Sequence, residues 1–108
     1  MTDWRALLTL HAALLSIAPP PTLGARVAYA AAVGRVNGPL AGLEALDAIA
    51  DEAAQRFQPA WATRAHLLAE AGRAEDAARA YDRAISLTTD HGARWYLERR
   101  RAELRFFS

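Results

Sequence analysis

The chain has 108 residues, of which 53% are hydrophobic, and a formal net charge of +1. This length predicts one small domain with a modest core, and a net charge near zero argues against a general nucleic-acid binder. The absence of cysteine excludes a disulfide framework, a thiolate zinc site and a cysteine nucleophile. With few β-branched residues in an apolar composition, we expect an all-α fold.

The first predicted element is a leading helix over residues 3–18. Its apolar side chains lie on more than one side, with Trp4, Leu10 and Ile17 among them. A helix that is apolar on several sides needs several partners. We therefore expect part of this helix to remain uncovered in the isolated chain and to allow weak homodimerisation through residues 3–18.

The same leading segment bears on the location of the protein. Its apolar run lacks a strongly basic start and ends in three prolines at residues 19–21, which argues against a signal sequence. No apolar run in the chain approaches the roughly 20 residues that a membrane-spanning helix requires. We expect a soluble cytoplasmic protein without membrane contact.

A first hairpin is predicted over residues 23–54. An alanine-rich helix runs to about residue 36, and a third helix runs from residue 39 to about residue 54. Between them stand Asn37, Gly38 and Pro39. Asn or Gly suits the residue after a helix, and Pro suits the first turn of the next helix.

A second hairpin is predicted over residues 59–88, where two amphipathic patterns meet at Gly72. Glycine adopts the left-handed conformation that ends many helices. Trp61 and Tyr81 supply bulk, and small residues that would let the two helices approach closely are Ala65, Ala77 and Ala84. This pattern is typical of one tetratricopeptide-type repeat.

The offset of 34 residues between Gly38 and Gly72 supports a second, degenerate repeat. A capping helix over residues 92–105 completes the predicted helices. Side chains that can cap helix N-termini precede three of them: Thr2 or Asp3, Thr22, and Thr89 or Asp90. The expected architecture is a right-handed α-solenoid fragment of tetratricopeptide-like antiparallel hairpins, closed by an atypical cap.

Four motifs occur in a specific order along the chain. They are W-x-x-L-L-x-L-x-x-x-L-L followed by Pro-Pro-Pro-Thr, then V-N-G-P-L-A-G-L-E-A-L-D, then R-A-H-L-L-A-E-A-G-R-A-E-D-A-A-R-A-Y-D-R-A-I, and finally E-R-R-R-A-E-L. This order resembles the long C-terminal extension of one group of extracytoplasmic-function RNA polymerase sigma factors. That extension contains tetratricopeptide-like helices. Asn37 stands where the extension usually has an acidic residue.

The resemblance implies a regulatory role in transcription initiation through contacts with the upstream sigma domains or RNA polymerase. Such sigma factors carry their promoter-reading helices upstream of the extension, and nothing like those helices occurs in this sequence. We expect Met1 to begin an excised domain or a protein that has lost the rest, with no direct promoter recognition by this segment. The alternative is a free-standing tetratricopeptide-type adaptor that binds a peptide or helix of another protein.

A partner-binding groove is the first candidate site. On the concave side of the two hairpins we expect a shallow apolar floor with polar side chains above it. The residues proposed to line it are Arg35, Ala62, His66, Ala69 and Glu70, joined by Ala28 and Ala32. Helical repeats often bind helices or extended peptides in this way. The alternative interpretation is that the alanines only permit close helix packing.

The charge distribution indicates a second candidate site. Residues 40–90 carry a net charge of −4, whereas residues 92–108 carry +3. A basic face on the last helix could meet an acidic partner or a nucleic-acid backbone; its residues would be Arg94, Arg99, Arg100 and Arg101. The alternative is a solvated cap helix. We also expect a solvated surface for the acidic cluster Glu44, Asp47, Asp51 and Glu52.

The residue pattern gives no support to catalysis. His11, His66 and His91 lie on different predicted helices or caps, without the spacing of metal ligands. No nucleophile, phosphate-loop or dinucleotide motif occurs. We expect neither an enzyme nor a bound metal or cofactor.

Overall fold

The computed structural model describes residues 3–15 and 22–104. Its helices, in chain order, are α1 (Trp4–Leu15), α2 (Leu23–Asn37), α3 (Pro39–Asp47), the 3-10 helix η1 (Glu52–Arg56), α4 (Gln58–Glu70), α5 (Ala74–Ser86) and α6 (His91–Glu103). The part of the chain that the structure describes contains no strand. The predicted all-α class is therefore confirmed for these residues.

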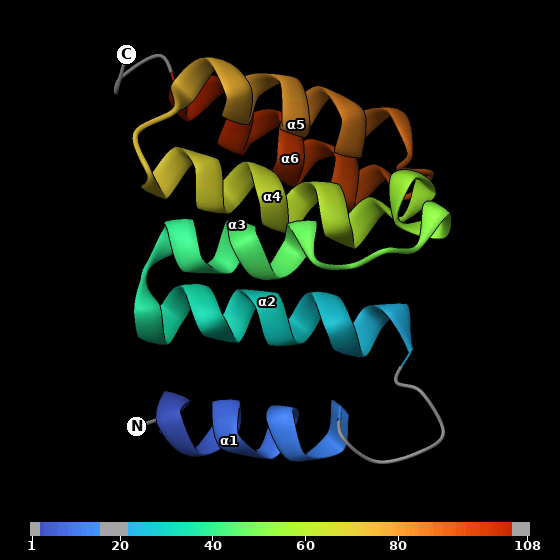
Figure 1. The fold of residues 1–108 in the computed structure, drawn as a ribbon. Coiled ribbons are helices and arrows are strands. Elements are labelled where there is room, and N and C mark those ends of the chain that lie inside the picture. Colours follow the sequence, from blue (N-terminus) through green and yellow to red (C-terminus); the bar gives the residue numbers. More distant parts are fainter. Residues whose placement is uncertain (1–2, 16–21, 105–108) are drawn as a thin grey trace.

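The helices α1 to α5 lie side by side in chain order, and each packs against the next (Figure 1). In addition, α2 contacts α4, and α6 packs against α5. The row of helices measures 40 × 27 × 25 Å, with α1 at one end and the α5–α6 pair at the other (Figure 1). This arrangement places α2, α4 and α6 where they can share one surface.

The turn after α4 has the form expected from its glycine. Gly72 has a φ of +80°. The backbone N–H of Gly72 donates to the carbonyl of Ala69 at 3.1 Å, and that of Arg73 donates to the carbonyl of Leu68 at 2.9 Å. These two bonds define a Schellman motif, which satisfies carbonyls at the end of a helix. The left-handed turn at Gly72 is confirmed.

The turn after α2 is tighter and differs in conformation. Gly38 has φ +98° and ψ 162°, its N–H donates to the carbonyl of Gly34, and its own carbonyl accepts from Gly42. A single residue thus ends α2 and begins α3, with Pro39 in the first helical position. Asn37 remains inside α2, so the positive φ falls on the glycine.

The core is centred on α4 and α5. The small residues predicted to allow their close approach are completely buried: Ala65, Ala77 and Ala84. Tyr81 is 3% exposed and supplies the bulk of this cluster. Trp61 is only half-buried, and its indole N–H donates to the carbonyl of Gln55 at 3.0 Å. Trp61 therefore packs at the edge of the core, next to η1, rather than at its centre.

A glycine contact holds α2 against α3. A Cβ added to Gly42 would lie 2.9 Å from the Cα of Gly34, closer than real Cβ atoms approach. Without side chains here, the two backbones approach each other directly, and Leu67 of α4 covers the contact. The sequence pattern alone predicts no role for either glycine.

The third helix is shorter than predicted, because it ends at Asp47 and not near residue 54. The Asp51 carboxylate accepts a hydrogen bond from the N–H of Ala53 and begins η1. The carbonyl of Gln55 then accepts from the Trp61 indole and from Arg83 at 3.2 Å. The chain therefore forms η1 in place of the last turns of the predicted helix, and side chains of α4 and α5 hold η1 in position.

Predicted caps precede three helices. The Asp3 carboxylate accepts from the N–H groups of Arg5 and Ala6, Thr22 caps α2, and Asp90 caps α6. The predicted end of the leading helix and the prolines at 19–21 lie outside the described residues, as do Ile17 and residue 105.

Candidate functional site: a groove across three helices

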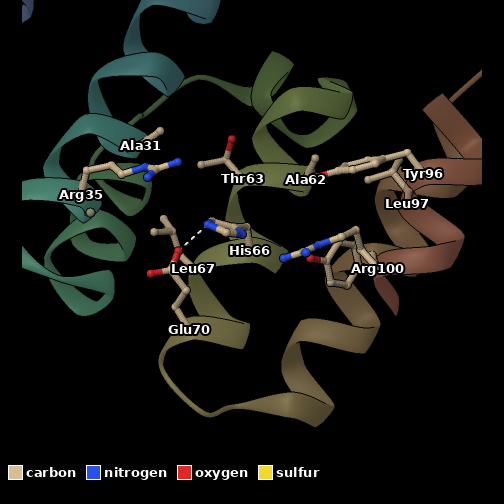
Figure 2. Close-up of a pocket in the computed structure, with 12 residues that line it drawn as sticks. Ala31, Arg35, Ala62, Thr63, His66, Leu67, Glu70, Tyr96, Leu97 and Arg100 are labelled. Atoms are coloured by element: carbon tan, nitrogen blue, oxygen red, sulfur yellow. Dashed lines mark ion pairs between the residues drawn. The ribbon is translucent and has the colours of Figure 1, made fainter. Parts of the chain in front are cut away.

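A groove of about 250 Å³ crosses α2, α4 and α6. Figure 2 shows α2 on one side, α4 along the floor and α6 on the other side. Its lining residues are Ala31, Gly34 and Arg35 from α2; Ala62, Thr63, His66, Leu67 and Glu70 from α4; Tyr81 from α5; and Tyr96, Leu97 and Arg100 from α6. An adjoining hollow extends it past Ala69 to Glu103 and Leu104.

Small side chains keep the floor open. Ala31 and Gly34 stand one helical turn apart on α2, and Ala62 lies on the facing side of α4. Residues three or four apart share one helix face, so these positions produce a strip without bulky groups. Figure 2 shows the polar side chains around this strip.

His66 and Glu70 form an ion pair one helical turn apart on α4 (Figure 2). Their side chains are 44% and 47% exposed, so solvent screens much of the interaction. The pair carries charge on both partners only when the imidazole is protonated. It offers donors and acceptors in the middle of the groove.

Arg35 supplies the cation on the α2 side. Its guanidinium lies 4.8 Å from the centre of the Trp4 ring, a cation–π geometry. In the part of the chain that the structure describes, no carboxylate forms an ion pair with Arg35. Within the described residues the guanidinium thus faces the groove without a carboxylate partner, and the aromatic ring of α1 lies against it.

Arg100 supplies the cation on the α6 side. A hydrogen bond with the buried Tyr81 raises the pKa of the Arg100 guanidinium above its ordinary value, and nearby Glu103 adds to this effect. The Nη1 of Arg100 lies 3.3 Å from Oε2 of Glu103. These contacts hold the guanidinium, which is charged at any accessible pH, at the groove wall.

The structure brings together all five side chains predicted for the groove. Arg35, Ala62, His66 and Glu70 line the main hollow, and Ala69 lines the adjoining one. Two further alanines expected there, Ala28 and Ala32, line neither hollow. Ala28 is exposed, and Ala32 is buried. Each helical residue turns the side-chain direction by about 100°, so it is Ala31 that faces the floor.

The four arginines predicted to form one basic face do not share a surface. Arg94 donates to the carbonyl of Thr88, Arg99 lies over Trp95, and Arg101 forms an ion pair with Asp82. Arg100 instead lines the groove. Sequence reasoning missed this role and that of Tyr96, although their four-residue spacing could have indicated one shared side of α6.

The acidic cluster remains on the surface, as predicted. Glu44, Asp47, Asp51 and Glu52 are all exposed, and Asp47 forms an ion pair with Arg64 at 2.7 Å. Among the residues that the structure describes, no group of three or more metal-ligating side chains could hold a metal ion.

None of the helices in the described part of the chain combines the length and apolar character required to span a bilayer. No protein-family model, curated protein or solved structure matches the chain.

Proposed function

We propose that this chain is a protein-interaction and regulatory domain from the C-terminal extension of an extracytoplasmic-function sigma factor. Its groove would contact the upstream sigma domains or RNA polymerase in the cytoplasm and modulate transcription initiation. This segment would not read the promoter itself. We propose no reaction and no cofactor for it.

The observation that carries the proposal is the groove across α2, α4 and α6. Its lining is mostly apolar and includes small residues of α2 and α4, and its two walls each carry an arginine, Arg35 and Arg100. Grooves that bind helices or extended segments offer this combination of apolar floor and polar edges. The resemblance of the motif order to sigma-factor extensions supports a role for such a surface in transcription.

We further propose that the two helix pairs are tetratricopeptide-like repeats. Gly38 and Gly72 are 34 residues apart and both have a positive φ. In each pair the second helix follows the glycine within two residues. A 34-residue period with a glycine turn is typical of these repeats.

A free-standing adaptor that binds a peptide or helix of another protein is the second candidate, because the same groove would serve it. The reading frame upstream of Met1 distinguishes the two. An in-frame continuation with helix-turn-helix character would favour the sigma-factor extension, and a ribosome-binding site before a natural start codon would favour the adaptor.

The direct test is a promoter–reporter assay with the upstream domains, with and without residues 1–108. We expect Arg35→Glu and Arg100→Glu to reproduce the effect of deleting the segment, because each reverses a charge at the groove wall. Arg73→Glu, an exposed charge reversal at the α4–α5 turn, is the matched control and should leave transcription unchanged. Unaltered transcription without the segment, under every condition tried, would refute the regulatory role and favour the adaptor.

A further inference from the structure

One side of α6 is exposed along the described chain, where Arg99 also forms an ion pair at 4.0 Å with Glu103 of the same helix. It carries Trp95, Glu98, Arg99 and Ala102, which are all exposed. Their spacing of three, four and seven residues from Trp95 places them on a single stripe. Trp95 is 60% exposed, and the Arg99 guanidinium lies 5.3 Å from the centre of its ring. We call these four residues the α6 stripe.

The α6 stripe is distinct from the other two sides of this helix. Leu97 is buried and Leu104, next to the helix end, is buried too, whereas Tyr96 and Arg100 line the groove. The helix lies at the end of the row, beside α5 (Figure 1). A large exposed tryptophan at such an end marks an interaction surface, because Trp, Tyr and Arg dominate the binding energy of protein interfaces.

The stripe is complementary to itself. If two copies of α6 pack antiparallel about a centre between Glu98 and Arg99, Trp95 of one copy faces Ala102 of the other, and Glu98 faces Arg99. Each contact occurs twice, because residue i meets residue j and residue j meets residue i. The large ring then packs against the smallest side chain of the stripe, and every charge at the centre faces an opposite charge.

We infer that the α6 stripe binds a second copy of this chain, forming a symmetric antiparallel dimer anchored by Trp95 and by reciprocal Glu98–Arg99 pairs. This inference is independent of the proposed function, because Tyr96 and Arg100 stay on the groove side of α6. It also places the dimer contact on α6 and not on the leading helix, where the sequence predicts it. On α1, Trp4 is engaged by Arg35, and the exposed Leu10 lacks an adjacent pair of opposite charges.

Sedimentation velocity of the 108-residue chain over a concentration series tests the inference. We expect a reversible monomer–dimer equilibrium for the wild type and dimer dissociation constants raised by at least about tenfold for Trp95→Ala, Glu98→Arg and Arg99→Glu. Both charge variants place like charges opposite each other at the centre of the dimer. All of these positions are exposed, and circular dichroism checks that the helices remain.

Mixing the two charge variants gives the decisive measurement. Glu98→Arg has two arginines at the centre and Arg99→Glu has two glutamates, so neither should pair with itself, but an equimolar mixture should form a heterodimer. The matched control is the double variant Trp4→Ala, Leu10→Ala on α1, which should dimerise as the wild type does. A wild type that stays monomeric up to about 1 mM, a mixture that stays monomeric, or loss of the dimer in the α1 variant alone would overturn the inference.

Discussion

The pairs α2–α3 and α4–α5 each turn at a glycine with positive φ but achieve close packing by opposite means. In α2–α3, the backbones meet at Gly34 and Gly42, where no side chain intervenes. In α4–α5, fully buried alanines surround one large residue, Tyr81. The first pair should therefore tolerate no added atoms, whereas the second should be most sensitive to atoms removed.

Removal of the aromatic ring from α4–α5 should have the largest effect. We expect Tyr81→Ala to lower the free energy of unfolding by about 3–5 kcal/mol, because it leaves a cavity in the core. Chemical denaturation monitored by circular dichroism measures the change. Tyr81→Phe keeps the ring but removes the hydroxyl that interacts with Arg100, and should cost only about 1–2 kcal/mol. Equal losses for the two variants would show that the hydroxyl, not the packing, holds the pair.

The second largest effect on stability should come from adding a methyl group where α2 and α3 meet. We expect Gly42→Ala to lower the free energy of unfolding by about 3 kcal/mol, because its Cβ would meet the backbone at Gly34 and the carbonyl of Ala30. Gly24→Ala is the matched control in α2, since its Cβ would meet only ordinary contacts at 3.9 Å. The free energy of unfolding of that variant should rise by up to about 1 kcal/mol, because alanine has a higher helix propensity than glycine.

Thermal denaturation of both glycine variants provides the check. A Gly42→Ala protein as stable as the Gly24→Ala protein would mean that α2 and α3 can separate without cost. The stability of Gly34→Ala should lie between those of Gly42→Ala and Gly24→Ala. Its Cβ would meet the end of the Leu67 side chain, which can change rotamer.

The contrast between the pairs also shows what could be predicted from the sequence. The helices of α4–α5, their alanine contacts and the Gly72 turn follow from periodicity and from turn chemistry, which act locally. The Gly34–Gly42 contact could not be predicted in this way, because it depends on which faces of α2 and α3 meet. The end of α3 was missed for a similar reason, since Trp61 and Arg83 hold η1 from distant positions.

The candidate groove was predictable in part. Arg35, Ala62, His66, Ala69 and Glu70 follow from the helix faces of the two pairs, and all of them line the hollows. The contribution of α6 was not foreseen. A run of arginines indicates a charged helix, but the packing of Leu97 decides which of them faces inward.

The two turn glycines should respond differently to asparagine, because their conformations differ. Gly38, with φ +98° and ψ 162°, occupies a region that is almost exclusive to glycine, where other residues cost about 1–3 kcal/mol. We expect Gly38→Ala and Gly38→Asn each to lower the free energy of unfolding by about 2 kcal/mol. Nothing lies within 4 Å of a Cβ at either turn, so backbone strain alone sets the cost.

At Gly72, in its left-handed Schellman turn, we expect Gly72→Ala to cost about 1 kcal/mol and Gly72→Asn to cost less, since asparagine tolerates this conformation. Urea denaturation of the four proteins compares the turns. If asparagine were tolerated equally at both positions, the proposed difference in backbone conformation would be wrong.

The smallest effect should come from the ion pairs that join each helix pair to its neighbour. Arg101 of α6 binds Asp82 of α5 through two bonds, of 2.6 and 3.1 Å, whereas Arg64 of α4 binds Asp47 of α3 through one bond of 2.7 Å. The hydrogen bond with Asp82 raises the pKa of the Arg101 guanidinium, which is protonated throughout the accessible pH range in any case. However, the side chains of this pair are 39% and 56% exposed, which allows water and salt to screen them.

A double-mutant cycle with Asp82→Asn and Arg101→Gln isolates the interaction. We expect a coupling energy of about 0.5 kcal/mol at low ionic strength, and a smaller value in concentrated salt because mobile ions screen exposed charges. The corresponding cycle with Asp47→Asn and Arg64→Gln should give a lower value, since a two-bond arginine–carboxylate contact constrains geometry better than a single bond. A coupling at Asp82–Arg101 that exceeds the loss in Gly42→Ala would mean that charge at α5–α6 stabilises the molecule more than the backbone packing of α2–α3.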